Sequence, residues 1–249
     1  MRFAEAAADA AIAIFQQPNA FGCLESAPEL AAAAAAGGAL PVAHVDLASL
    51  GVLEAPGAYG CAMAIGEGQS IGNYQSYGGP HYGFLAARQE FIRRMPGRIV
   101  GETTDLEGRR GFVLTLQTRE QHIRREKATS NITTNQTLLA LAGLMTLCWL
   151  GPVGLRELGE SCLALAGYAK ERIGLPLAFD RPTFKEVAFR TPIPAREVVA
   201  RAREHGVHPG YPLGRDYPGL DDILLVALTE KRTPAEIDRL ADVLEEVTA

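Results

Sequence analysis

The sequence lacks several features that would point directly to a function. None of its four cysteines forms a C-x-x-C pair, so neither a structural zinc site nor a redox-active dithiol is expected. Basic residues are not in excess, because the formal net charge is −5. A surface that binds phosphodiesters needs clustered lysine and arginine. The sequence therefore predicts no metal site and no nucleic-acid partner.

Long apolar runs are also missing. Acidic Glu5 and Asp9 interrupt the first residues, so no secretory signal is expected. The longest apolar stretch, residues 138–150, is too short to span a bilayer, and we interpret it as part of a buried helix. All four cysteines lie among apolar residues, which is typical of buried free thiols in a reducing compartment. These features predict a cytoplasmic protein without a membrane segment.

The first third of the chain has the pattern of a parallel sheet. Short apolar runs at residues 11–15, 40–45 and 62–65 predict strands, and an alanine-rich helix is expected between the first two. Ser26 and Glu29 form a candidate capping box for that helix, which should end at Gly37-Gly38. The chain has 249 residues, about half of them apolar, and can therefore bury a core.

The carboxyl ends of parallel strands are where ligands usually bind in such sheets. Gln17, Asp46 and Gln69 each stand just past the end of a predicted strand. We therefore expect these three side chains at one edge of the sheet.

The remaining elements suggest a second, smaller part. Residues 83–86 predict a strand and residues 88–95 a short helix, while residues 111–116 predict a further strand or one arm of a hairpin with residues 98–100. Two long helices, 134–150 and 153–173, should be separated at Gly151-Pro152. Strand-like runs at 177–179, 187–189 and 223–228 alternate with helices at 196–205 and 234–247, the latter with a capping box of Thr233 and Glu236. We expect the carboxy-terminal part of a large α/β domain over residues 1–133, connecting helices over 134–173 and a small α+β domain over 174–249.

A glycine-rich segment, residues 66–83, directly follows a predicted buried strand. It contains six glycines and many polar residues. Glycine allows positive φ and a close approach of backbone to a ligand or partner. The segment is either a long surface loop or a functional loop, since long loops inside compact domains often carry function.

A second polar segment, residues 117–132, precedes a predicted helix. Lys127, Thr129, Ser130 and Asn131 place a cation, two hydroxyls and an amide at the start of that helix. Such donors, together with the positive end of a helix, can hold a phosphate. The alternative is that Ser130 or Asn131 simply caps the helix and the charges are solvated.

These segments carry a family resemblance. The motifs run colinearly from about residue 16 to 135: Gln-Gln-Pro-Asn at 16–19, Gly-Glu-Gly-Gln-Ser-Ile-Gly at 66–72, Tyr-Gly-Gly-Pro-His-Tyr-Gly-Phe at 77–84, Pro-Gly-Arg-Ile-Val at 96–100, Gly-Arg-Arg-Gly-Phe at 108–112, Leu-Gln-Thr-Arg-Glu-Gln-His-Ile-Arg-Arg at 116–125 and Lys-Ala-Thr-Ser-Asn-Ile-Thr-Thr-Asn at 127–135. Together they resemble the glycine dehydrogenase (decarboxylating) family, the P-protein of the glycine cleavage system, and most closely subunit 1 of its two-subunit form. Phe184-Lys185-Glu186 and Thr229-Glu230 are similar but less diagnostic.

The resemblance implies the fold-type-I architecture of enzymes that depend on pyridoxal phosphate, here with a partial large domain, a mainly parallel sheet and a small domain. It also implies decarboxylation of glycine and transfer of the aminomethyl group to the lipoyl H-protein. In this family the cofactor is an electron sink and is held by a lysine. Aligned on Gly78-Gly79-Pro80, the position of that lysine is Gln69, and none of the four lysines is near. The resemblance therefore implies a subunit 2 that carries the lysine and holds most of the cofactor, while this chain contributes no catalytic residue and is inactive alone.

The resemblance also suggests which residues meet the partner. Lys127, Thr129, Ser130 and Asn131 are the candidates for contacts to the phosphate of pyridoxal phosphate bound by the partner, with Arg125 in support. His81 and Tyr82 could line a shared substrate cleft, although a histidine beside Gly-Gly-Pro often only makes a turn hydrogen bond. Asp46 stands where this fold carries the aspartate that pairs with the pyridine nitrogen, and we expect it to be vestigial or structural here.

The chain starts further along than the family pattern. Its subunits have a longer amino-terminal stretch, so we expect either a truncated chain or a fragment of a split protein that is stable only with a partner. Three functions remain open: a subunit that supplies one wall of the decarboxylase site, a non-catalytic assembly partner of the lysine-bearing subunit, and a different fold-type-I enzyme such as a cysteine desulfurase with Cys61 as nucleophile.

Overall fold

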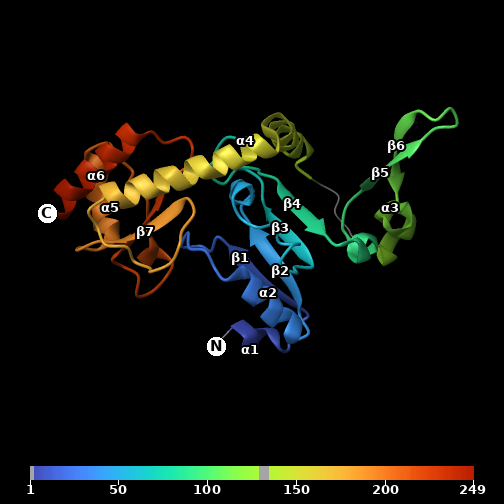
Figure 1. Ribbon diagram of the computed structural model, residues 1–249, viewed down its shortest axis with the longest axis horizontal. Helices are drawn as coiled ribbons and strands as arrows, with labels where there is room; N and C mark the ends of the chain where they lie inside the picture. Colours follow the sequence, from blue (N-terminus) through green and yellow to red (C-terminus); the bar gives the residue numbers. More distant parts are fainter. Residues whose placement is uncertain (1–2, 129–134) are drawn as a thin grey trace.

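The computed structural model describes residues 3–128 and 135–249. Figure 1 shows two α/β parts joined by one long helix, with a hairpin arm that extends away from both. The first part holds the predicted parallel strands, and the second holds both the small sheet and the C-terminus. The candidate site lies where the first part meets the second part.

The first part is built on a four-stranded sheet of order β1-β2-β3-β4. β1 (Ile12–Gln17), β2 (Leu40–Val45) and β3 (Met63–Glu67) are parallel, with Ile14 opposite Val42 and Ala43 opposite Ala64. β4 (Gly83–Ala87) is antiparallel to β3. The prediction of a mainly parallel sheet is therefore confirmed.

Two helices cover one face of this sheet. α1 (Phe3–Ala7) packs on α2 (Ala27–Ala36), and α2 packs on β1 and β2. Phe15 and Val45 lie in the core between them. The predicted capping box at α2 is wrong, because Ser26 makes no side-chain hydrogen bond at the helix start, although the helix ends at Gly37 as expected.

On the opposite face the edge strand β1 is exposed, whereas Val42 of β2 is buried. The alternation along β1 turns Ile12 and Ile14 outward, and 58% of the Ile14 side chain is exposed. Among the described residues, β1 pairs only with β2 and β4 only with β3. An unpaired edge strand with exposed apolar side chains is a typical binding surface for further polypeptide.

The long helix α4 (Thr137–Arg172) contains a break at Gly151, whose φ of 60° and ψ of −173° are not helical. The two helices predicted on either side of Gly151-Pro152 are therefore present, joined at a kink. The 3-10 helix η1 (Ala48–Gly51) packs against α4 so closely that a Cβ on Gly51 would lie 2.1 Å from the Leu155 carbonyl oxygen. This contact joins α4 to the sheet.

The amino-terminal half of α4 is not buried, so the prediction of a buried helix over residues 138–150 is wrong. Leu138, Leu144, Met145 and Trp149 are all exposed, Trp149 to 87%. The helix is long and apolar enough to cross a membrane, but only by length and composition, a test that core helices of soluble proteins also pass. Cys148 lies on this exposed stretch, whereas Cys23, Cys61 and Cys162 are buried, so the expectation of buried thiols holds for three of the four.

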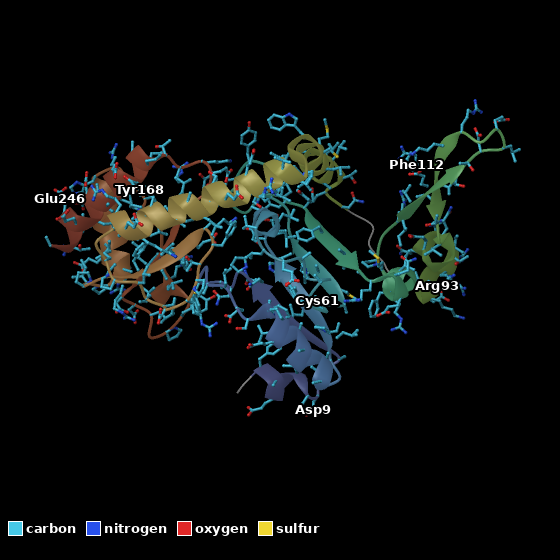
Figure 2. All side chains as sticks on the ribbon, viewed as in Figure 1. Asp9, Cys61, Arg93, Phe112, Tyr168 and Glu246 are labelled. Atoms are coloured by element: carbon cyan, nitrogen blue, oxygen red, sulfur yellow. The ribbon has the colours of Figure 1, made fainter. Side chains whose placement is uncertain are left out.

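Residues 88–128 form the arm. It begins with the 3-10 helix η2 (Gln89–Arg94), continues as the antiparallel hairpin of β5 (Ile99–Thr104) and β6 (Arg110–Thr115), and ends in three short helical turns, η3 (Gln117–Arg119), α3 (Gln121–Arg124) and η4 (Arg125–Lys127). The hairpin alternative is thus the correct one. These elements make their main contacts with one another, and Figure 2 shows Phe112 on the hairpin far from Cys61, which lies just before β3.

The second part is a three-stranded antiparallel sheet of order β7-β9-β8, covered by helices. β7 (Glu186–Arg190) and β9 (Ile223–Ala227) are the predicted strands, β8 (Tyr211–Pro212) is short, and η5 (Leu213–Arg215) follows it. α5 (Ala195–Glu204), α6 (Pro234–Thr248) and the end of α4 share its core. The capping box of Thr233 and Glu236 is confirmed. Residues 177–179 form no named strand, although Leu177 makes an isolated bridge to Phe189.

Candidate functional site

A cavity of about 380 Å³ lies at the carboxyl ends of β1, β2 and β3, where the second part meets the sheet. The strands contribute Gln16, His44 and Glu67, and the loops after them contribute Asp46 and Gln69. The second part contributes Lys185 and Glu186 at the start of β7. The expectation that polar side chains meet at this edge of the sheet is confirmed for Asp46 and Gln69.

Asp46 is held by contacts on both carboxylate oxygens. Its Oδ1 accepts a hydrogen bond from the Ala48 backbone N–H at 2.8 Å, which starts η1. The Ser49 hydroxyl donates to the Asp46 carbonyl oxygen at 2.7 Å. Oδ2 accepts a hydrogen bond from Nζ of Lys185 in an ion pair. Asp46 therefore has the structural role expected of it, and it also joins the two parts.

Lys185 is a buried lysine whose side chain is only 11% exposed. Burial acts to lower the pKa of this amine, but the charge and hydrogen bond of Asp46 outweigh it and raise the pKa above its ordinary value. Lys185 is therefore a protonated cation that donates to Asp46 at neutral pH.

Glu186 is the neighbour of Lys185 and lines the same cavity. Burial raises the pKa of Glu186, and the charge of Lys185 counters this only in part. Two carboxylates and one ammonium group therefore lie together at this junction.

Gln69 lines the cavity beside these groups and is fixed by local hydrogen bonds. Its Nε2 donates to the Asn73 carbonyl oxygen at 2.9 Å, and its backbone N–H donates to Glu67 Oε1 at 2.9 Å. Asn73 in turn donates to the Leu139 carbonyl oxygen of α4 at 3.2 Å. The glycine-rich segment is thus anchored both to β3 and to α4, and it presents a neutral amide to the cavity.

The Gln-Gln-Pro-Asn motif forms the loop that brings Lys185 to the cavity. Gln17 accepts from the Glu25 backbone N–H at 2.8 Å, and Asn19 accepts from the backbone N–H of Phe21 and Cys23 at 2.9 and 3.0 Å. The peptide bond between Gln17 and Pro18 is cis. These bonds shape residues 19–25 into a turn.

The turn of residues 19–25 is hydrogen-bonded to residues 182–184, which directly precede Lys185 and β7. The Phe184 backbone N–H donates to the Gly22 carbonyl oxygen at 3.1 Å, and the Leu24 N–H donates to the Pro182 oxygen at 2.7 Å. Gly22 has a φ of +78°, and a Cβ there would lie 2.2 Å from the Glu186 carbonyl oxygen. Only glycine allows this approach, and it places Lys185 next to Asp46.

His81 and Tyr82 do not belong to the residues that line this cavity. Tyr82 is buried, its hydroxyl donates to the Ile71 carbonyl oxygen at 3.3 Å, and its ring packs where a Cβ on Gly68 or Gly143 would otherwise lie. Its observed contacts fix the glycine-rich segment against α4. His81 is half-buried between this segment and β4.

Lys127 is exposed at the end of η4 on the arm and does not line the cavity. Thr129, Ser130 and Asn131 lie outside the described residues. The candidate phosphate-binding segment therefore does not meet Gln69 or Asp46 through Lys127.

Cys61 is buried, and burial raises its pKa to about 11. The thiolate is the nucleophilic form of cysteine, so a thiol with this pKa is unreactive at neutral pH. This argues against the desulfurase alternative. Within residues 3–128 and 135–249, no group of three or more histidine, cysteine, aspartate or glutamate side chains could hold a metal ion.

Lys185 and Glu186 were not predicted as site residues. Together with Phe184 they form a triplet that resembles the family. Lys185, however, lies 139 residues from Asp46 in the sequence. A lysine followed by a glutamate at the start of an apolar strand is the only local signal, and it does not reveal the ion pair.

The comparisons with known proteins agree on one family. The model of the glycine cleavage system P-protein matches residues 2–244. Proteins named "Probable glycine dehydrogenase (decarboxylating) subunit 1" from Chlorobium limicola and Moorella thermoacetica are 48% and 47% identical over 94% and 97% of this chain. This chain spans 53% and 55% of their lengths, about half.

Solved structures give the same result. A glycine decarboxylase (P-protein) of the glycine cleavage system in inhibitor-bound form is 45% identical and superposes with a TM-score of 0.85, over 94% of this chain and 54% of that one. A cysteine desulfurase from Thermococcus onnurineus has a TM-score of 0.65 over 98% of this chain and 62% of its own, and at 17% identity it shows the fold alone. The fold is therefore that of the fold-type-I enzymes, as expected, and the chain belongs to the glycine cleavage system P-protein family.

Proposed function

We propose that this chain is a subunit of a cytoplasmic glycine decarboxylase that depends on pyridoxal phosphate and passes the aminomethyl group to the lipoyl H-protein. The family and the names of its relatives support this activity. The partner that completes it would be a subunit 2 carrying the cofactor lysine. The proposal involves neither nucleic acid nor a membrane.

The cavity of this chain does not itself fit pyridoxal phosphate. The cofactor needs a lysine amine for its aldehyde and an acidic or basic partner for its ring nitrogen. Gln69 offers an amide, which forms no Schiff base, and the Asp46 carboxylate already binds Lys185. In the proposed complex the cofactor, which serves as the electron sink, is therefore held by the partner.

The arm is the single feature that carries the proposal. It extends away from the sheet, and Figure 1 shows it reaching beyond the rest of the chain. Its residues 88–128 contain ten basic and six acidic residues, in a chain whose net charge is −5. An excess of positive charge attracts a phosphate-bearing site.

The arm also exposes apolar side chains. Val100, Phe112, Val113 and Leu114 are exposed on the hairpin, Phe112 to 62%, and Ile123 on α3 is exposed as well. Exposed apolar groups beside cations are typical of protein–protein interfaces. In the proposed complex the hairpin docks on subunit 2, and Lys127 with Thr129, Ser130 and Asn131 approaches the cofactor phosphate held there.

The test is reconstitution with a subunit 2 that carries the lysine. We expect glycine–bicarbonate exchange only in the mixture, and a Lys127→Ala variant that weakens binding of pyridoxal phosphate about tenfold, because a charge-assisted contact to phosphate is lost. Lys231→Ala is the matched control, since Lys231 is an exposed lysine in the second part. If this chain leaves the cofactor affinity of subunit 2 unchanged, its contribution to the site is disproved.

A second function has its own support. The exposed edge strand at Ile12 and Ile14 and the exposed half of α4 are surfaces that further polypeptide would cover. A chain that binds subunit 2 through these surfaces without completing its site would be an assembly partner. Co-purification of the two chains without exchange activity, and without an effect of Lys127→Ala, would identify this second function.

A further inference from the structure

The ion pair between Asp46 and Lys185 spans the junction of the two parts inside the cavity. Asp46 follows β2 of the first sheet, and Lys185 precedes β7 of the second. The pair is largely removed from solvent, with 11% of the lysine and 25% of the aspartate side chain exposed. No role in the proposed decarboxylation accounts for it.

The position of this pair has a chemical meaning in α/β sheets of this kind. Ligands bind outside the carboxyl ends of the parallel strands, and an aspartate commonly pairs with the ring nitrogen of pyridoxal phosphate. In this chain both Asp46 oxygens already accept hydrogen bonds, Oδ1 from Ala48 and Oδ2 from Lys185. Since Oδ2 contacts the Lys185 ammonium group, a cationic ring nitrogen that pairs with this carboxylate would either lie beside that positive charge or displace it.

Displacement would leave the Lys185 ammonium group buried without its partner. Removing one member of a buried ion pair is costly because the remaining charge keeps its desolvation penalty. Such a cost lowers the affinity for the displacing ligand by about a hundredfold or more.

The other charges around the cavity act in the same direction. Its lining contains the carboxylates Asp46, Glu67 and Glu186 against the single ammonium group of Lys185, with His44 as the remaining titratable side chain. A phosphate group that enters would meet more negative than positive charge. Like charges at short range disfavour binding.

We propose that Lys185 is a built-in counter-cation for Asp46 that closes the cavity of this chain to pyridoxal phosphate. Gln69 removes the attachment point for the aldehyde, and Lys185 removes the partner for the ring. The proposal depends on the proposed function only in the choice of pyridoxal phosphate as the excluded molecule.

The first experiment asks whether Lys185 is the barrier. The full chain is incubated with pyridoxal phosphate, imines are trapped with borohydride, and mass spectrometry locates the labelled lysines. Gln69→Lys restores an amine at the cavity. We expect labelling at position 69 to increase at least tenfold in Gln69→Lys/Lys185→Met relative to Gln69→Lys, and to stay unchanged in the control Gln69→Lys/Lys170→Met, because Lys170 does not line the cavity.

The second experiment keeps Lys185 and uses the isosteric substitution Asp46→Asn, because loss of Lys185 could prevent folding. In the unaltered chain we expect Lys185 to be labelled at least tenfold less than the exposed Lys231, because a protonated, paired amine does not attack an aldehyde. Asp46→Asn should raise labelling of Lys185 at least tenfold, since burial then favours the neutral amine. Asp222→Asn, which removes the partner of Arg190 elsewhere in the second part, should leave it unchanged.

Two results would overturn the proposal. One is labelling of position 69 in Gln69→Lys that is as strong as in Gln69→Lys/Lys185→Met. The other is labelling of Lys185 in the unaltered chain at the rate of the exposed Lys231. Both are read from peptides of this chain, alone or with subunit 2, so they are independent of whether the complex decarboxylates glycine.

Discussion

Phe184 offers the sharpest test of how the junction is built. Its side chain is fully buried, next to Lys185 in sequence, and it packs with Ala48 of η1 and Cys162 of α4. Leu24, in the turn of residues 19–25, packs against the same cluster. One aromatic ring therefore contacts η1, the long helix and the loop that positions the ion pair.

Phe184→Ala should lower the free energy of unfolding by about 3–5 kcal/mol, since it removes a buried ring and leaves a cavity. For a chain of this length each kcal/mol corresponds to about 2–4 °C in Tm, so a decrease of roughly 6–20 °C is expected. Circular dichroism during heating and during urea titration measures both values. The same variant should loosen the Lys185 contact and raise labelling of Lys185 by pyridoxal phosphate.

Phe112→Ala is the matched control. The same ring is removed, but from the exposed face of the hairpin, so the free energy of unfolding should change by no more than about 0.5 kcal/mol. Equal decreases in Tm for the two variants, or a decrease below about 2 °C for Phe184→Ala, would refute the packing role assigned to Phe184.

Three further predictions concern a cap, a titration and a surface. Thr233→Ala should destabilise the chain by about 1 kcal/mol, read as a lower urea midpoint, whereas Ser26→Ala should leave the midpoint unchanged because only Thr233 makes a side-chain cap bond. The stability difference between the unaltered chain and Lys185→Met should be constant from about pH 7 to 10 and shrink above the ordinary lysine pKa of 10.5, because the folded-state pKa is raised and the pair is lost as pH rises through it; urea titrations that show the loss near pH 7 would contradict this. The emission of Trp149, the only tryptophan, should move to shorter wavelength when subunit 2 binds, and unchanged emission would show that the exposed half of α4 is not covered.

The strands of the first sheet follow from local sequence. Apolar runs such as Leu40–Val45, bounded by Gly38 and Asp46, are typical of buried parallel strands. Once the strands are parallel, their ends meet, and Asp46 and Gln69 are brought together by that geometry alone. The break at Gly151 follows equally directly, because Pro152 cannot continue a helix hydrogen-bond ladder.

Contacts between distant residues could not be predicted in this way. Ser26 has the residue type of a cap but makes no cap bond, because local preference does not fix the side-chain geometry. The burial of α4 was predicted from its apolar composition, but burial depends on what packs against the helix. Tyr82 lies in a polar loop of the sequence. Its packing role becomes visible in the structure, where Gly68 and Gly143 make room for its ring.

The amide at position 69 and the ammonium group of Lys185 are best understood together, because both lie in the cavity that contains Asp46. A cavity with an amide at position 69 and an unpaired Asp46 would hold a buried carboxylate without compensation, which is unfavourable. Lys185 supplies that compensation and, through Asp46, ties the second part of the chain to the sheet. The Asp46 carboxylate thus has a structural use in this chain that does not depend on a bound cofactor.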